Sequence, residues 1–325
     1  MKKILYAAFL ILLSGCIHEY PDGEGTDPTR VAVDVGLTLD MEWEEYRNGT
    51  KGGSADGYSR RFIVEVQREG ETVFRRAIVP EEFTEGQTPF LFSETLSLHA
   101  LQYTVAVWSD YVETDSEDDG YYDASHLRNV TVKEPYTGNT DYRDCHYSTL
   151  PLDLRPYRGQ WNARVHLDMD MERPLARYRI IATDAADFLE TARSKFPGET
   201  EFNIRFSYGF YFPLAFSAWE GRPADSRLGV AFTDTLVLPA DGTEELLLGS
   251  DHIFVNGTES YIPLSIEITA GGGDLVGKLG GLNVPYERGC VTTVRGRFLT
   301  AMFGSGGIGI DPGFDGDIDI DLDNF

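Results

Sequence analysis

The residue spacings most suggestive of chemistry lie in two short segments. His166, Asp168 and Asp170 alternate along an apparent strand, so an imidazole and two carboxylates share one face. Such a set can bind a metal ion, but it is also the ordinary polar half of a half-buried strand, which is the interpretation we favour. Cys145 and His146 are adjacent, and adjacent residues on an extended chain point to opposite faces, which disfavours a nucleophile and base pair. We therefore expect neither a metal site nor a catalytic pair here.

Catalytic signatures do not occur in the sequence. We find no G-x-S-x-G, H-E-x-x-H, phosphate-binding loop or C-x-x-C pair. The carboxylate pairs of glycosidases leave no such signature, because they need only two acids at a separation that the fold sets. We expect a protein that binds other molecules without catalysis and without a cofactor.

The charge balance narrows the class of partner. Lys and Arg number 28 against 53 Asp and Glu over 325 residues, which gives a formal net charge of −25. A field of this sign repels phosphate backbones, so we expect no nucleic-acid partner. Hydrophobic residues make up 42% and aromatic residues 12%, in a chain with 34 Gly and only 5 Met. These proportions are typical of a globular protein and favour β-structure.

The N-terminal residues predict export and a lipid anchor. Lys2 and Lys3 precede an apolar run that ends at Leu13, which is shorter than the roughly 20 residues of a membrane span but suits a signal peptide. The run continues into Leu12-Leu13-Ser14-Gly15-Cys16, which resembles the bacterial lipobox, where the cysteine thiol is acylated before cleavage. We therefore predict a signal peptide over residues 1–15 and lipidation at Cys16.

The segment that follows Cys16 predicts where the chain is held. Residues 16–28 are polar and rich in Gly, Pro and acids, so we expect a flexible tether. Two or three acyl chains exceed the threshold for stable anchoring in a membrane. Acidic residues directly behind the lipid resemble the surface-export signals of Bacteroidetes lipoproteins, although a plain solvated linker has the same composition. We predict a lipid-anchored protein of the outer membrane, exposed at the cell surface.

Period-2 alternation along most of the chain predicts an all-β, mainly antiparallel fold in two sandwich domains. Val31 to Leu39 form a clean half-buried strand in the first domain, for which we predict residues 29–150. A connector with two prolines follows Leu150. The second domain, 151–303, is expected to open with the alternating row from Trp161 to Met169. Residues 304–325 form a Gly- and Asp-rich tail.

The second domain contains the strongest local signals. Residues 184–195 predict the one short helix, because Ala185, Phe188, Leu189 and Ala192 follow helical spacing and Pro197 ends the pattern. Aromatic and aliphatic residues occupy six consecutive even positions from Phe202 to Phe212, which predicts a long strand. We expect Pro213 to stop that strand.

The tail ends in a second kind of alternation. Ile318, Ile320 and Leu322 point one way in an extended chain, and the aspartates between and beside them point the other. An isolated strand of this kind needs a sheet edge. It could be the last edge strand of the second domain, a strand donated to another subunit, or a calcium site built from its carboxylates. Alternation sets the carboxylates in a row and not in a cage, which disfavours calcium.

The aromatic residues raise the alternative of a sugar-binding platform. Most of them lie on inward rows and are expected in the core. Trp43, Trp108, Tyr121 and Tyr122 are the better candidates for exposure and hence for contact with a ligand such as a glycan.

Besides Cys16, the chain contains two cysteines. Cys145 and Cys290 lie in what we expect to be different domains. Although an oxidising compartment permits a disulfide, we expect two unpaired, partly buried thiols.

Three stretches resemble the fimbrillin-type surface lipoproteins of Bacteroidetes, particularly their fimbrial anchor and accessory subunits. None of the stretches is a catalytic motif, and together with the lipobox they cover most of the chain in order. They are Val107–Tyr111 with Tyr121–Asp123 and Tyr136–Asp144, then Glu172–Ile180, and finally Val291–Thr300 with Gly309–Gly316.

The resemblance implies two transthyretin-like β-sandwiches and a role in fimbrial (pilus) assembly, anchoring or cell adhesion, with partner subunits bound by β-strand addition. In related structural pilins a protease removes an N-terminal strand after an arginine, which opens a groove for a neighbour's strand. Arg30, Arg47 and Arg60 are the candidate positions here, whereas an anchor subunit would keep its lipid and its first strand. The alternative function is a glycan-binding surface lipoprotein of a nutrient-uptake system.

Overall fold

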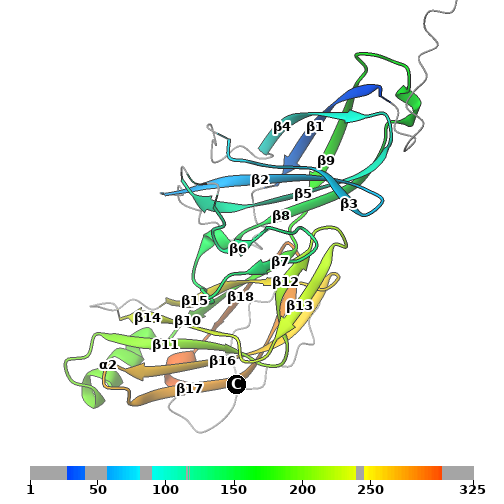
Figure 1. Ribbon diagram of the computed structural model, residues 1–325. Helices are drawn as coiled ribbons and strands as arrows, with labels where there is room; N and C mark the ends of the chain where they lie inside the picture. The colour runs from blue at the N-terminus through cyan, green and yellow to red at the C-terminus, as the bar shows by residue number, and fades with distance from the viewer. Residues whose placement is uncertain are drawn as a thin grey trace, which may run out of the picture.

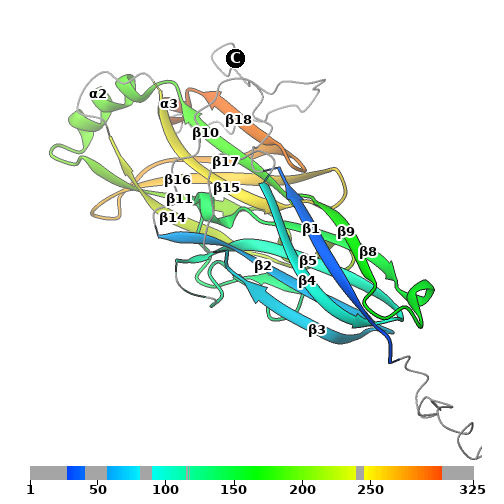
Figure 2. The same ribbon diagram turned by 90° about the horizontal axis from the view of Figure 1, so that it is seen from above.

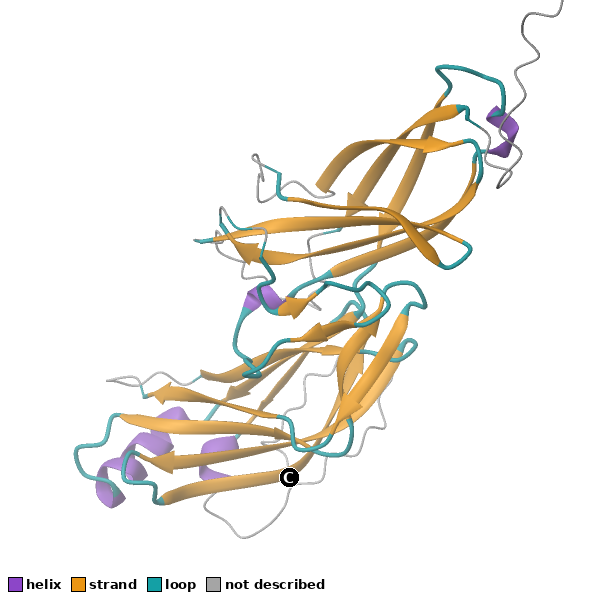
Figure 3. Ribbon diagram, in the orientation of Figure 1, coloured by secondary structure: helices purple, strands orange, loops and turns teal. Residues whose placement is uncertain are grey.

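The computed structural model describes residues 28–40, 57–80, 90–114, 116, 118–238 and 245–301. Strands make up most of these residues, and they form several layered sheets, as Figure 3 shows. The expected all-β sandwich fold is confirmed. Figure 1 shows one pair of layers above a second group of sheets, with β6 and β7 lying where the two meet.

The first pair of layers encloses one hydrophobic cluster. One sheet has the order β4 (Phe90–His99), β1 (Arg30–Leu39), β9 (Arg164–Met171), and the other β3 (Glu71–Ile78), β2 (Tyr58–Arg68), β5 (Gln102–Glu113), β8 (His146–Asp153). The inward row of β1 from Val31 to Leu39 is at most 1% exposed and packs against Phe62, Val64 and Val107. The alternation of β1 therefore identified its buried face.

The partner of β9 differs from the expectation. The row from Trp161 to Met169 was predicted to open the second domain, but β9 pairs in parallel with β1, with Val33 opposite Val165 and Leu39 opposite Met171. Parallel strands need a long crossover, and here everything from β2 to β8 lies between the two. Sequence alternation identifies a strand but carries no information on which distant strand it joins. The domain bounds themselves remain predictions.

The remaining sheets share a second hydrophobic cluster. Their orders are β15 (Leu246–Phe254), β10 (Leu175–Ala182), β18 (Val291–Gly296); β14 (Ala231–Val237), β11 (Glu201–Tyr208), β16 (Glu259–Ala270), β17 (Leu275–Glu287); and β13 (Arg222–Arg227), β12 (Phe212–Ser217), β7 (Val130–Val132), β6 (Tyr122–Asp123). Short 3₁₀ turns lie at Asp141–Arg143 and Arg155–Tyr157. This cluster also takes in Ala106 and Trp108 of β5, whereas Val105 and Val107 belong to the first cluster. Strand β5 thus contributes to both cores.

The predicted helix is confirmed as α2 (Ala185–Lys195). Ala185, Phe188, Leu189 and Ala192 are its buried residues. Asp184 does not cap α2 through its side chain; its carboxylate instead accepts hydrogen bonds from the Leu299 and Thr300 amides at the start of α3 (Phe298–Ala301), at 3.2 and 2.6 Å. One carboxylate therefore ties together the two helices, α2 and α3, which lie near each other in Figure 2.

The predicted long strand is interrupted. Strand β11 ends at Tyr208 and β12 begins at Phe212, while Pro213 lies inside β12 and does not stop it. Between them Phe210 has a φ of 55° and is 74% exposed, so it leaves the inward row. The chain bends here because it moves from the sheet of β16 to the sheet of β7. Regular alternation in sequence does not reveal such a corner.

A buried polar group, which we call the polar joint, links three segments of the chain. Its members are Arg60 on β2, Asp144 and His146 at the start of β8, and Arg173 before β10. The Asp144 carboxylate accepts from Arg60 Nη2 at 3.2 Å and from Arg173 Nε at 2.9 Å. Burial opposes its ionisation, yet the charges of Arg173, His146 and Arg60 hold the pKa of Asp144 well below its ordinary value. Burial, opposed by the Asp144 charge, lowers the pKa of His146 to about 3.

A second buried polar group, the Asp251 network, lies within the second hydrophobic cluster, which we call the lower core. Asp251 on β15 accepts from Arg143 Nη1 at 2.6 Å, from the Tyr136 hydroxyl at 2.6 Å and from the Tyr208 hydroxyl. Because the partners come from the segment before β8 and from β11, this carboxylate connects segments distant in sequence. Cys145 is fully buried and Cys290 partly so, and the two do not form a disulfide bond.

Candidate ligand-binding pocket

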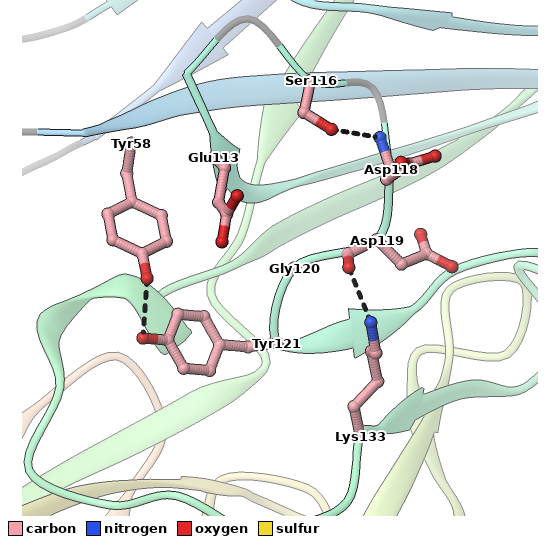
Figure 4. A pocket seen from close by; sticks show the side chains of 8 residues that line it. All are labelled: Tyr58, Glu113, Ser116, Asp118, Asp119, Gly120, Tyr121 and Lys133. Atoms are coloured by element: carbon pink, nitrogen blue, oxygen red, sulfur yellow. Dashed lines mark hydrogen bonds between the residues drawn. The ribbon is translucent and has the colours of Figure 1, made fainter.

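A pocket of about 350 Å³ opens where β2 begins and β5 ends. Tyr58 and Glu113 lie opposite each other in the pairing of these strands, so the sheet itself sets one wall. The segment from β5 to β6 and Lys133, which follows β7, supply the other. The lining residues are Tyr58, Glu113, Ser116, Asp118, Asp119, Gly120, Tyr121 and Lys133. Figure 4 shows Tyr58 and Tyr121 pointing toward one another across the pocket.

Two tyrosines, Tyr58 and Tyr121, form the aromatic side of the pocket. The Tyr58 and Tyr121 hydroxyls are 3.2 Å apart, with ring centroids separated by 5.9 Å and planes inclined at 27°. Tyr142 stacks on Tyr58 with a centroid distance of 4.0 Å, which supports the ring from behind. The hydrogen bond to Tyr121 and partial burial raise the pKa of Tyr58 to about 12, so its hydroxyl stays neutral. Half-exposed rings with neutral hydroxyls are a common surface for stacking a sugar.

The opposite side of the pocket is acidic. Arg61 binds Asp119 at 2.8 Å and Asp110 at 2.7 Å, which fixes the loop against β2. Lys133 Nζ donates to the Asp119 carbonyl at 2.7 Å, and the Asp118 amide donates to Ser116 Oγ at 3.1 Å. The rim can therefore offer both hydrogen-bond donors and acceptors to a polyhydroxylated ligand. Among the residues that the structure describes, no group of three or more His, Cys, Asp or Glu could hold a metal ion.

The structure corrects the expected exposure of two aromatic residues. Trp108 is fully buried, donates from Nε1 to Asp110 at 3.1 Å and meets Tyr122 edge to face at 5.6 Å. Tyr122 is also fully buried. Trp108 is buried because β5 has a core on each side, whereas a strand at a surface would expose its alternate residues. Tyr122, on β6, is part of the same hydrophobic cluster as Trp108. Neither residue can be reached by a ligand in this conformation.

The other predicted site residues have different outcomes. Tyr121 is partly exposed and lines the pocket, as a ligand-contact residue must. Trp43, Cys16, Ile318, Ile320 and Leu322 lie outside the described residues. His166, Asp168 and Asp170 form the exposed row of β9, as we favoured, with His166 Nδ1 3.7 Å from Asp34.

Sequence reasoning missed Tyr58, Tyr142 and Lys133. Tyr58 begins a strand and Lys133 follows a short one, and neither position has a motif. Only the pairing of β2 with β5 brings Tyr58 beside the acidic loop. Trp161 (63%), Phe210 (74%) and Tyr211 (67%) are also exposed aromatics that were not among the better candidates for exposure, because two of them occur in regular alternating rows.

Comparison with known protein families gives a match to one model over residues 28–324, described as a family of unknown function (DUF6562). The chain belongs to this family. No curated protein matches the sequence.

Several solved structures are similar to the DUF6562 chain. The fimbrial anchor protein Mfa2 from Porphyromonas gingivalis is 11% identical, with 76% of this chain and 81% of that chain covered and a TM-score of 0.39. A candidate adhesin from Bacteroides ovatus is 12% identical, with coverage of 77% and 75% and a TM-score of 0.43. A candidate cell-adhesion protein from Bacteroides eggerthii is 12% identical, with coverage of 89% and 93% and a TM-score of 0.42.

Proposed function

We propose that this protein is a lipid-anchored cell-surface adhesin or fimbrial anchor/accessory subunit that binds partner subunits by β-strand addition. The observation that carries the proposal is the position of β1. It begins at Arg30, close behind the predicted lipid at Cys16, and is paired along its length with β4 on one side and β9 on the other. Among the described helices, none is long and apolar enough to cross a membrane.

Such a strand is suited to transmit a load from an anchor. A pull at the N-terminal end acts along β1, so the hydrogen bonds to both neighbours oppose it together, as they would not in a strand peeled from an edge. The buried row of β1 must also leave the core at the same time. A subunit fixed to a membrane and holding a fibre needs this resistance.

The positions of the three candidate cleavage sites, Arg30, Arg47 and Arg60, indicate whether proteolysis could remove the first strand. Arg60 is fully buried and bound to Asp144, so cleavage after it would require β2 to open. Arg30 is exposed at the start of β1, and cleavage there would leave β1 in place. Arg47 lies outside the described residues. In the proposed role β1 is kept and no groove opens between β4 and β9.

The outer edge of β9 is the proposed acceptor for a partner's strand. Ala163 O accepts from Ala32 N at 2.9 Å, so the odd-numbered residues bond to β1. The N–H and C=O groups of the even-numbered residues then point away from β1. Among the described residues, they meet another strand only near Glu172, at Tyr147 of β8. His166 on this edge is 73% exposed at its side chain. A basic partner strand would suit the exposed Asp168 and Asp170.

The test uses two variants in cells that carry the full chain. Cys16→Ser should abolish palmitate labelling and release the protein from the outer-membrane fraction. His166→Pro removes one outward N–H and should reduce co-isolation with sheared surface fibres at least about tenfold, whereas His166→Ala should retain it. Unchanged labelling of the Cys16 variant would contradict the anchor, and equal fibre content in the two His166 variants would contradict strand addition at β9.

A second candidate function rests on the pocket. Its stacked tyrosines, acidic rim and lysine favour a glycan ligand, which would make the protein a glycan-binding surface lipoprotein. This role is compatible with the first, because the pocket lies at the Tyr58 end of β2 and not on β9.

A further inference from the structure

The second edge of β18 has no strand partner among the described residues. Strand β18 pairs with β10 in parallel and borders its sheet, as the two neighbouring ribbons in Figure 2 show. Arg177 N donates to Cys290 O and Thr183 N to Gly296 O, each at 3.0 Å, so the even-numbered residues bond to β10. A parallel strand uses alternate residues for each neighbour. The N–H and C=O groups of Val291, Thr293 and Arg295 therefore point to the open side.

The outer face of this sheet is basic, in a chain with 53 acidic and 28 basic residues. Arg179 lies opposite Thr293, and Arg295 lies opposite Ile181, so Arg177, Arg179 and Arg295 share the outer face. Arg177 binds Asp141, and Arg295 Nε lies 3.7 Å from Glu245. Those acids are 65% and 56% exposed at their side chains, so the face remains open to competition from another acidic group.

The inner face of β18 is apolar. Val294 is fully buried and Thr292 is 7% exposed. A strand added beside β18 would place its alternate side chains against these two different faces. It should therefore alternate strictly between acidic residues, which match the arginines, and aliphatic residues, which extend the core.

One segment of this chain has that pattern. Asp317, Asp319, Asp321 and Asp323 alternate with Ile318, Ile320 and Leu322. Residues 302–316 connect α3, which directly follows β18, to this segment; when extended they span up to roughly 50 Å, against roughly 20 Å for the length of β18. The segment can thus return along the edge in either direction. Two other sheet edges suit it less, since β9 carries Asp168 and Asp170 and β14 carries Asp234.

We infer that residues 317–323 pair in cis with the open edge of β18, with the aspartates on the arginine side and Ile318, Ile320 and Leu322 against the core. The tail then completes the sheet of the chain that carries it, and β18 is closed to other strands. This choice between the two strand roles of the tail is independent of the proposed function, which uses β9.

Hydrogen–deuterium exchange of the chain from residue 17, with and without residues 311–325, tests the inference. Deletion should accelerate exchange at Val291, Thr293 and Arg295 at least about tenfold and leave the β9 amides unchanged. A synthetic peptide of residues 311–325 should restore protection in the truncated chain and should not bind the full one. Unchanged exchange at β18 after deletion would overturn the inference.

Variants with reversed charges test the same strand pairing without deleting the tail. Arg295→Asp should accelerate exchange at β18, and combining it with Asp319→Arg should restore protection, while Arg295→Lys serves as the matched control. No restoration in the double variant would contradict the proposed pairing. Protection that rises with protein concentration, together with dimers in sedimentation, would show a strand donated between copies and would also overturn pairing in cis.

Discussion

The same polar residue types have different roles in two regions of this protein, one buried and one at the surface. The polar joint and the Asp251 network bury arginines, aspartates, a histidine and tyrosines with almost no exposure. The pocket at the end of β2 and β5 presents tyrosines, aspartates and a lysine at the surface. In the buried groups every charge faces a fixed partner, whereas the pocket leaves hydroxyl and carboxylate groups at its rim. The contrast teaches that placement, and not residue type, separates a structural polar cluster from a binding surface.

Removing a buried carboxylate should have the largest effect, and it tests whether the buried polar groups stabilise the fold. Asp251→Ala leaves the buried Arg143 guanidinium without its ion-pair partner and removes the carboxylate acceptor of the Tyr136 and Tyr208 hydroxyls. We expect a loss of about 3–5 kcal/mol in the free energy of unfolding, measured by urea denaturation. A loss below about 1 kcal/mol would show that the lower core does not depend on this network.

The pH dependence of folding stability tests the same role for the polar joint. The pKa of His146 is about 3 in the folded chain, below the ordinary value of about 6.5, so the unfolded chain binds the proton first as the pH falls. Stability should therefore be fully present above about pH 6.5 and decline toward pH 3. Because the pKa of Asp144 is also lowered, its contribution should be lost below about pH 4, as that carboxylate becomes protonated in the unfolded chain.

The matched variant for this series is His146→Gln, which removes the titrating group. Urea midpoints at pH 7.5, 6 and 4.5 should fall less steeply for the variant than for the natural chain. Parallel slopes would contradict the assignment to His146.

A substitution in the pocket should reduce ligand binding and leave the stability of the fold unchanged. Tyr121→Ala removes one wall while its neighbour Tyr58 keeps the stacking contact with Tyr142. On a glycan array, signals of the natural chain should fall at least about tenfold, with the thermal midpoint within a few degrees. Trp161→Ala, at an exposed aromatic outside the pocket lining, is the control. Equal loss in both variants would place the binding surface elsewhere.

The smallest expected effect concerns a surface ion pair. Arg155 and Asp153 are about half exposed at their side chains and 2.7 Å apart. Solvent screens such pairs, so Asp153→Ala should leave the urea midpoint unchanged within error. A shift comparable to that of Asp251→Ala would erase the distinction between buried and exposed polar groups.

Local pattern predicted the parts of this fold that local physics determines. The burial of Phe188 and Leu189 in α2 and the inward row of β1 follow from side-chain period alone. The pairing of β9 with β1, the corner at Phe210 and the burial of Trp108 depend on which distant strands meet, and sequence spacing does not contain that information. For the same reason Tyr121 could be proposed as a ligand contact, but Tyr58 could not, because a strand pairing joins the two.

Strand β5 has a consequence for how the chain folds. Its Val105 and Val107 side chains belong to one core while Ala106 and Trp108 belong to the other. A fragment that contained only one half would leave an indole or a row of valines facing water. The two halves are therefore expected to unfold in a single cooperative transition, and neither can be excised as a self-sufficient piece without redesigning that one strand.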